Sequence, residues 1–318
     1  MNMLNAACQC TVQFSFNPCG CDSGKGFLRH TGAMSTPYSP TVRLRRLARE
    51  LRKMREISGL SPEAAAARLG WSRSKVSRIE TGRTRASPAD VAAVCDLYGT
   101  GSSVRAGLIQ LAKEVRHRGW WTAYADVFTG SYIGLEDEAR RIHQWEVQLV
   151  PGLLQTEDYA RTVIKAGRPD VNDHDDIHRR VMARMARRTL LSRQNAPELW
   201  AVLDEAVVRR PIGSPEVMRN QLEALLVFAR RPNVTIRILP FSTGAHAGLE
   251  GAFTILSFAE EADPDVAYVE GTAGDVYVES SQHVDRYKVA FARIWDAALP
   301  PEETTRLIAE IKECLSDD

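Results

Sequence analysis

The sequence predicts an all-α domain of five helices over residues 41–118, followed by an α+β domain over residues 119–318. Two observations support this division. In the first domain, apolar residues recur at spacings of three and four between Ser or Pro starts and Gly stops, a pattern typical of short helices. From Gly119-Trp120-Trp121 onward, aromatic residues and short apolar runs replace the arginine-rich helices. We therefore place the domain boundary at about residue 118.

Residues 1–40 are predicted to be a disordered tail, because they lack periodicity and are rich in Asn, Gly, Ser, Pro and Cys. Met34 stands just before the first predicted helix, so we interpret the tail as an over-extended reading frame. The alternative is a zinc site formed by Cys8, Cys10, Cys19 and Cys21, although their spacing differs from that of the usual zinc knuckles. We expect neither a metal nor a cofactor in this protein.

The first two predicted helices each carry an apolar stripe that packs against its neighbours. The first covers residues 41–58, with the stripe at Leu44, Leu47, Leu51 and Met54. The second begins at the N-cap candidate Ser61, has Pro62 at its first helical position and stops at Gly70. These start and stop signals predict a tight turn at Gly70-Trp71.

A third helix is predicted to begin at Ser72 and to end at Thr81-Gly82. Val76 and Ile79 point inward, which leaves small polar and basic side chains outside: Arg73, Ser74, Lys75, Ser77 and Arg78. A short helix of this kind, propped on another across a tight turn, has the shape that enters a DNA major groove. The alternative is an ordinary helical hairpin with a solvated charged face.

Two further helices complete the predicted all-α domain. The fourth starts at Ser87-Pro88, runs through Leu97 and ends at Gly99. The fifth starts at Ser102 or Ser103 and carries an apolar face formed by Leu108, Leu111 and Val115.

Charge is distributed unevenly along the chain, although the formal net charge is only +1. Residues 43–85 hold thirteen Lys or Arg against four Glu, a net charge of +9, whereas residues 86–318 have a net charge of −9. The basic block is therefore the part expected to bind a polyanion. No apolar run approaches the roughly 18 residues that a membrane helix needs, so we expect a cytoplasmic protein without a membrane partner.

The second domain mixes strand-like and helical runs, which predicts an α+β fold. The predicted strands are residues 142–148, 199–203, 234–239, 253–258, 266–270 and 276–279, and the predicted helices are residues 157–165, 175–192, 215–230, 281–297 and 301–314.

The stretch from Ser72 to Arg83 resembles the recognition-helix signature of the Xre, or lambda-repressor-like, helix-turn-helix family. The resemblance implies base contacts by Arg73, Ser74 and Arg78. It also implies DNA-backbone contacts by Ser72, Lys75, Ser77, Thr81, Arg83 and Arg85. In that family the residue equivalent to Glu80 mainly ties the recognition helix into its domain, so we predict a structural role for Glu80.

The second domain resembles a large domain of unknown function that follows an Xre module in a group of actinobacterial regulators. The resemblance lies in Val150-Pro-Gly-Leu-Leu-Gln-Thr-Glu-Asp-Tyr-Ala, Leu203-Asp-Glu-Ala, Met218-Arg-Asn-Gln-Leu, Leu239-Pro-Phe-Ser-Thr-Gly-Ala-His and Gly251-Ala-Phe. It implies an antitoxin-like transcriptional regulator with a sensor or partner-binding domain, often paired with a small acidic protein encoded in the adjacent gene. The alternative is a protein-interaction module that sequesters such a partner, with DNA binding secondary.

A homodimer on a palindromic double-stranded operator is the expected assembly. One helix-turn-helix covers one half-site, and useful specificity usually needs two half-sites about 34 Å apart.

Carboxylates and histidines of the second domain give the remaining candidate sites. Glu205, His246 and Glu270 are candidates for binding a cationic ligand, a small molecule or a partner, against the alternative that each is held by backbone or arginine for structural reasons. His174 and His178 have a metal-like spacing, yet the acidic residues between them favour a solvated helix start. No phosphate loop, Ser/His/Asp order or nucleophile elbow is present, so we do not expect an enzyme.

Overall fold

The computed structural model describes residues 42–116, 120–124, 126–127, 132–167, 174–259, 263–271 and 274–315. The predicted disordered tail, its four cysteines and the predicted boundary at residue 118 lie outside these residues.

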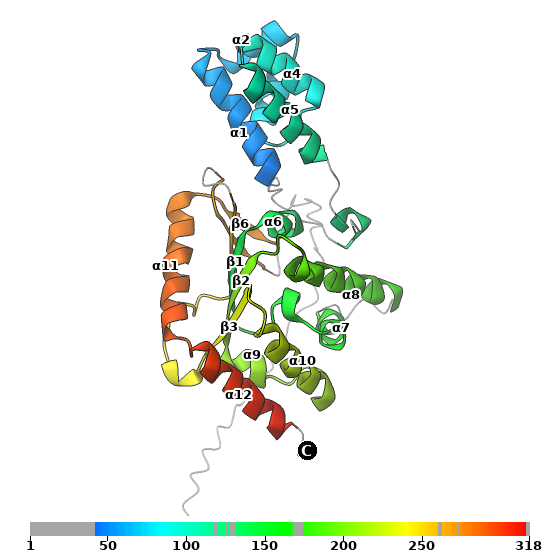
Figure 1. Ribbon diagram of the computed structural model, residues 1–318, viewed down its shortest axis with the longest axis vertical. Helices are drawn as coiled ribbons and strands as arrows, with labels where there is room; N and C mark the ends of the chain where they lie inside the picture. The colour runs from blue at the N-terminus through cyan, green and yellow to red at the C-terminus, as the bar shows by residue number, and fades with distance from the viewer. Residues whose placement is uncertain are drawn as a thin grey trace, which may run out of the picture. The chain divides into compact units, whose positions relative to one another are not determined.

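Five helices form the N-terminal domain within the described residues 42–116 (Figure 1). They are α1 (Val42–Ile57), α2 (Pro62–Leu69), α3 (Arg73–Glu80), α4 (Pro88–Leu97) and α5 (Ser102–Arg116). Their core is apolar and includes Leu47 and Leu51 of α1, Ile79 of α3 and Val91 of α4. The five predicted helices and the inward direction of Ile79 are confirmed.

Side-chain caps explain where these helices begin. The Ser61 hydroxyl accepts a hydrogen bond from the Ala64 amide at 3.1 Å, and Ser87 forms a reciprocal capping box with Asp90. Each cap satisfies an amide that the first helical turn leaves without a partner. Gly70 ends α2 with φ of 67°, a left-handed conformation that is far easier for glycine than for other residues.

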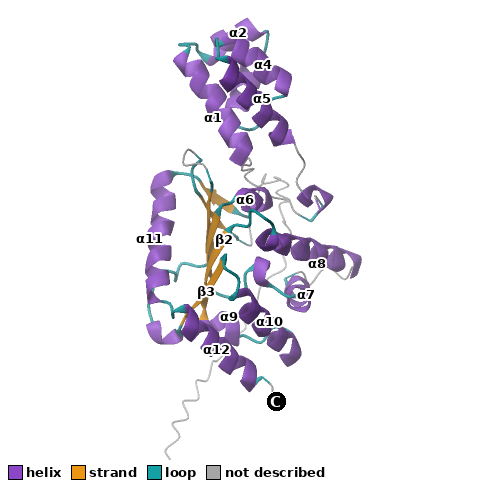
Figure 2. Cartoon of the chain, in the orientation of Figure 1, coloured by secondary structure: helices purple, strands orange, loops and turns teal. Residues whose placement is uncertain are grey.

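A six-stranded sheet forms the centre of the C-terminal domain in the described part of the chain (Figure 2). Its strands are β1 (Arg141–Glu146), β2 (Glu198–Asp204), β3 (Val234–Leu239), β4 (Phe253–Ser257), β5 (Val266–Val269) and β6 (Val276–Val278). The strand order is β3-β2-β1-β4-β5-β6. The strands β1, β2 and β3 are parallel, whereas β4, β5 and β6 add antiparallel pairs.

Helices cover both faces of this sheet (Figure 2). One face packs on α6 (Tyr132–Glu138), α7 (Glu157–Ala166), α9 (Glu205–Arg209), α10 (Pro215–Phe228) and α12 (Pro301–Cys314), and α8 (His174–Arg188) packs on α7. The other face packs on α11 (Ser281–Ala297). Successive side chains of a strand point to opposite faces. Accordingly Ile142 belongs to the first core and Trp145 to the second.

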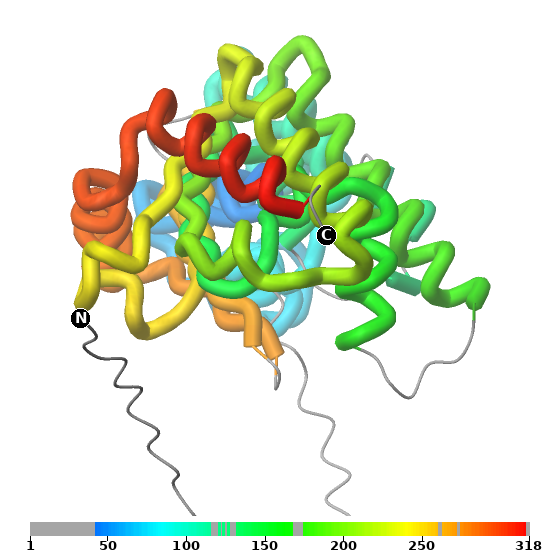
Figure 3. Tube along the Cα trace, turned by 90° about the horizontal axis from the view of Figure 1, so that it is seen from below, coloured from blue at the N-terminus to red at the C-terminus, as the bar shows by residue number. Residues whose placement is uncertain are grey.

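The C-terminal helix α12 packs on α10 and β3, as the red and yellow-green segments of Figure 3 show. Thr304 of this helix is buried, and its hydroxyl accepts a hydrogen bond from the Ile238 amide at 3.1 Å. Short 3-10 turns complete the described structure at Trp120–Tyr124, Gly152–Leu154, Thr189–Ser192 and Phe241–Thr243.

The α+β class and all six predicted strands are confirmed, although β1 ends at Glu146 rather than at residue 148. Helices α6 and α9 were not predicted from the sequence. Asp204 is the N-cap of α9 and accepts a hydrogen bond from the Ala206 amide at 2.8 Å.

Candidate nucleic-acid interface

The third helix of the N-terminal domain is fixed to its neighbours along its inner side. The Trp71 amide donates to the Ala66 carbonyl at 2.8 Å, and the Ser72 hydroxyl caps α3 by accepting from the Lys75 amide at 3.1 Å. Val76 and Ile79 are buried, with exposed fractions of 3% and 4%. These contacts hold the outer face of α3 in one orientation.

A buried ion pair adds to this anchorage. The Arg55 guanidinium donates to both carboxylate oxygens of Glu80, at 2.8 and 2.9 Å, and to the Leu60 carbonyl at 2.8 Å. The hydrogen bond with Glu80 raises the pKa of Arg55 above its ordinary value. The predicted structural role of Glu80 is confirmed. Arg55 lies four residues after Leu51, on the apolar stripe of α1, so its burial could have been predicted from that spacing.

The outer face of α3 and the segment after it expose the side chains predicted to contact DNA. All of them are exposed except Lys75, which is half-buried; the exposed ones are Ser72, Arg73, Ser74, Ser77, Arg78, Thr81, Arg83 and Arg85. Within the described residues, no ion pair or hydrogen bond engages the guanidinium groups of Arg78, Arg83 or Arg85. Three unpaired cations on one short segment attract a polyanion, and arginine binds both phosphates and guanine edges.

Two of the predicted contact residues already have partners inside the domain. Arg73 forms an ion pair with Glu63 at 2.5 Å, with both side chains more than half exposed. Lys75 donates to Asp90 at 2.6 Å and lies over the Trp71 ring at 3.8 Å. The exposed Arg73 pair is weak and can exchange for a DNA partner, whereas Lys75 also ties α3 to α4.

Hydroxyl groups of the same segment stabilise the helix ends. Ser72 is the N-cap of α3, and the Thr81 hydroxyl donates to the Ser77 carbonyl at 2.7 Å. A hydroxyl that donates to its own backbone retains lone pairs and stays exposed, so these roles are compatible with a neighbouring phosphate. The DNA contacts of Ser72, Ser77 and Thr81 stay predictions.

The three ligand candidates of the C-terminal domain have different neighbours. Glu205 is buried, pairs with Arg209 at 2.5 Å and accepts from the Phe241 amide at 2.8 Å. His246 accepts through Nδ1 from the Gly248 amide at 3.1 Å. Glu270 is exposed, and its charge raises the pKa of Glu146. The structural alternative therefore accounts for the contacts of Glu205 and His246.

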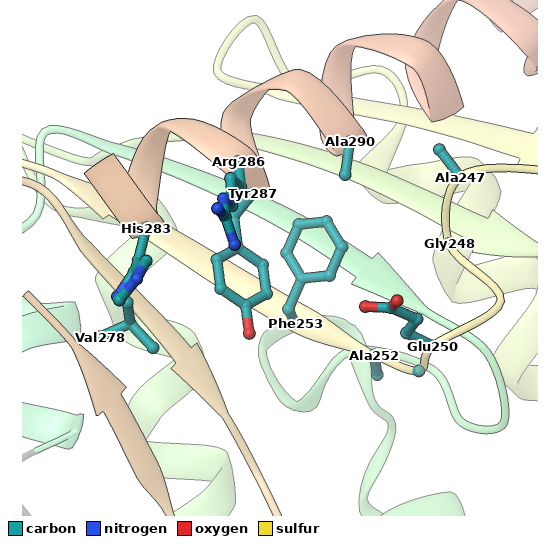
Figure 4. A pocket seen from close by; sticks show the side chains of 11 residues that line it. Ala247, Gly248, Glu250, Ala252, Phe253, Val278, His283, Arg286, Tyr287 and Ala290 are labelled. Carbon is teal, nitrogen blue, oxygen red and sulfur yellow. The ribbon is translucent and has the colours of Figure 1, made fainter. Parts of the chain in front are cut away.

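The C-terminal domain also contains a cavity that was not predicted from the sequence. It has a volume of about 400 Å³ and is lined by the segment from Ala247 to Phe253, by Val278 and by α11 (Figure 4). Its residues come from stretches far apart in the sequence, so no local motif marks it. The sequence feature that could have indicated the cavity is the spacing of His283, Arg286 and Tyr287, which places them on one side of α11.

The His174-to-His178 spacing belongs to the start of α8, where Asp175 and Asp176 occupy the first turn. Among the described residues, no three His, Cys, Asp or Glu side chains form a group that could hold a metal ion. Nor is any described helix both long and apolar enough to cross a membrane.

Comparison with known families gives two matches. A family described as a helix-turn-helix domain matches residues 46–108, and a family described as a domain of unknown function (DUF5753) matches residues 129–310. No curated protein matches the chain. The first match covers α3 and supports a DNA-binding regulator.

Proposed function

The chain belongs to the DUF5753 family, here preceded by a helix-turn-helix domain, and we propose that it is a sequence-specific, antitoxin-like transcriptional regulator. Its C-terminal domain receives a small molecule or a partner protein. The observation that carries the proposal is that Arg78, Arg83 and Arg85 are exposed and have no side-chain ion pair or hydrogen bond in the described part of the chain, on a segment whose inner side is fixed.

In the proposed complex, α3 lies in the major groove of double-stranded DNA. Arg73, Ser74 and Arg78 contact base edges, where a bidentate arginine distinguishes guanine from the other bases. Arg83 and Arg85 contact phosphates, which fix the register without reading sequence. The Arg55–Glu80 pair holds α3 in the groove at a constant angle.

A homodimer on a palindromic operator completes the proposal, because one α3 covers only one half-site. We place this activity in the cytoplasm and propose no catalytic reaction. The carboxylate of Glu205 is engaged by Arg209 and by the Phe241 amide.

Two arginine variants test the proposed reading of DNA. Arg78→Ala is expected to weaken binding to the preferred sequence by about 1–3 kcal/mol and to relax specificity at one position, because a base contact is lost. Arg85→Ala is expected to weaken binding to all sequences alike. It should also lower the slope of the logarithm of the binding constant against the logarithm of the salt concentration by about one, because one phosphate contact is lost. Fluorescence anisotropy with operator variants over a series of salt concentrations measures both effects.

Lys113→Ala is the matched control, since it removes a positive charge from an exposed position of α5 in the same domain. Its DNA affinity is expected to stay close to that of the wild type. Equal losses on every sequence for Arg78→Ala and Arg85→Ala would contradict the assigned roles.

The alternative, in which the C-terminal domain sequesters a small protein encoded in the adjacent gene, is favoured by exposed apolar side chains. Phe241, Leu249, Val276 and Val289 each expose more than half of their surface. Such side chains are typical of interaction surfaces when they are contiguous. Co-purification of the adjacent gene product with the full chain, and its loss with Leu249→Asp, would support this alternative.

A further inference from the structure

We propose that the cavity between the Ala247–Phe253 segment and α11 binds a small molecule with a flat apolar body and one carboxylate. This inference names the ligand class for the proposed sensor role and to that extent rests on it. The recognition chemistry, however, belongs to residues of the C-terminal domain alone.

The size of the cavity suits a small molecule. Its volume of about 400 Å³ lies within the range of roughly 300–1,000 Å³ that is typical of ligand pockets. Four parts of the fold contribute to it: the loop after β3, the start of β4, the end of β6 and the first turns of α11 (Figure 4).

The floor of the cavity is apolar and aromatic. Phe253 is 7% exposed, and its ring meets the Tyr287 ring edge to face, with centroids 5.1 Å apart. Val278, Ala252 and Ala290 extend the apolar lining. Flat apolar ligands bind well to such aromatic surfaces, because they bury a large area and interact with the ring quadrupoles.

One wall of the cavity is held in place by the core. The Gly248 carbonyl accepts from the buried Trp145 indole at 3.0 Å, and its amide donates to His246. A Cβ at position 248 would lie only 2.5 Å from the Trp145 Nε1 atom, so the loop can approach the core this closely only with glycine. The wall is therefore formed before any ligand arrives, which lowers the cost of binding.

Charged groups stand at two ends of the aromatic floor. Figure 4 shows His283 and Arg286 on one side of Phe253 and Glu250 on the other side. No ion pair or hydrogen bond within the described chain engages the side chains of these three residues. The Arg286 guanidinium can accept a carboxylate in a bidentate arrangement, with His283 as a second donor. Glu250 repels a second anionic group at the opposite end, which favours a monoanion.

The probe for the experiment is 2-naphthoate, with the uncharged 2-naphthamide as its matched partner. Isothermal titration of the full chain in the absence of DNA is expected to show saturable binding of 2-naphthoate and much weaker binding of 2-naphthamide. Arg286→Gln is expected to lower the 2-naphthoate affinity at least about tenfold, as for the loss of a charge-assisted hydrogen bond. Arg293→Gln, an exposed arginine of the same helix outside the cavity, is the control and should bind like the wild type.

A second variant tests the cavity itself. Ala290→Phe places a ring in the cavity and is expected to abolish binding of 2-naphthoate, with thermal unfolding recorded to confirm that the variant folds. Arg286 is exposed, so Arg286→Gln remains decisive even if Ala290→Phe does not fold. Wild-type affinity in Arg286→Gln, or no saturable binding of 2-naphthoate by the wild type, would overturn the proposal.

Anisotropy with the operator, measured on the same samples, separates this inference from the proposed function. Loss of 2-naphthoate binding with intact DNA binding in Arg286→Gln supports the cavity assignment. Failure of the wild type to prefer any DNA sequence, with intact 2-naphthoate binding, would overturn the DNA-reading proposal and leave the cavity assignment standing.

Discussion

The two domains use arginine in opposite ways. On and after α3, Arg78, Arg83 and Arg85 are exposed and have no side-chain ion pair or hydrogen bond within the described residues. In the C-terminal domain, Arg187 donates to both oxygens of the buried Glu136, at 2.8 and 3.0 Å, and Arg184 donates to the Gln155 amide oxygen at 2.9 Å. These three guanidinium groups of the first domain face solvent, whereas Arg184 and Arg187 of the second hold its own fold, as Arg55 does in the first.

This contrast also explains why the two proposed sites differ in how clearly the sequence marks them. A DNA-reading helix needs exposed residues at fixed spacing on one short segment, so a local motif records it. A ligand cavity in an α+β domain takes its lining from distant loops and helices, so its residues form no motif.

Removing the anchor of α3 should have the largest effect. Glu80→Ala leaves the buried Arg55 charge without its partner, and breaking such a pair costs roughly 3–5 kcal/mol. Hydrogen–deuterium exchange should show lost protection across α1 to α3, with the C-terminal sheet unchanged. Glu63→Ala, which removes an exposed carboxylate from α2, is the control. Unchanged protection in Glu80→Ala would contradict the anchoring role.

A buried carboxylate of the C-terminal domain should give a pH dependence of stability. Burial, aided by the charge of Glu270, raises the pKa of Glu146 from 4.5 to about 7, although Gln144 donates to it. A pKa that is raised in the folded state adds stability below about pH 4.5, and this stability is lost as the pH rises through 7. The loss is of order 3 kcal/mol, from about 1.4 kcal/mol for each pKa unit.

Glu146→Gln isolates this contribution. Denaturant unfolding from pH 4.5 to 8 should show the variant gaining stability relative to the wild type as the pH rises. The variant must be compared with the wild type because His143 also titrates. Burial lowers the pKa of His143 from 6.5 to about 4, so this residue makes the stability rise with pH between about 4 and 6.5. A constant difference between variant and wild type across this range would contradict the buried ionisation of Glu146.

The smallest expected effect concerns the exposed pair between Arg73 and Glu63. Glu63→Gln removes a carboxylate that competes with DNA for Arg73, so DNA affinity should rise slightly at low salt. The gain should vanish at high salt, where the pair is screened. Weaker binding in this variant would show that Glu63 positions Arg73 for DNA rather than competing for it.

Much of the fold could be predicted because local signals coincide with the elements. Ser61, Ser72 and Ser87 cap the helices whose starts the sequence indicated, and the runs predicted as strands form strands. The helices α6 and α9 were missed because they are short, with seven and five residues, although Asp204 is an N-cap signal for α9.

The candidate sites were predictable to a smaller degree. The exposure of Arg78, Arg83 and Arg85 follows from the inward spacing of Val76 and Ile79. The partners of Lys75 and Arg55 depend on tertiary contacts with Asp90 and Glu80, which lie 15 and 25 residues away. Glu205, which follows the predicted strand 199–203, and His246, which lies in the segment between β3 and β4, both have partners within the fold.

The central claim is that α3 reads a specific DNA sequence as one half of a symmetric pair. Sequencing of DNA fragments selected from a random library by the purified full chain tests it most directly. We predict a palindrome whose half-sites are centred about one helical turn apart, and its loss with Arg78→Ala. Recovery of DNA without any enriched sequence would contradict the claim.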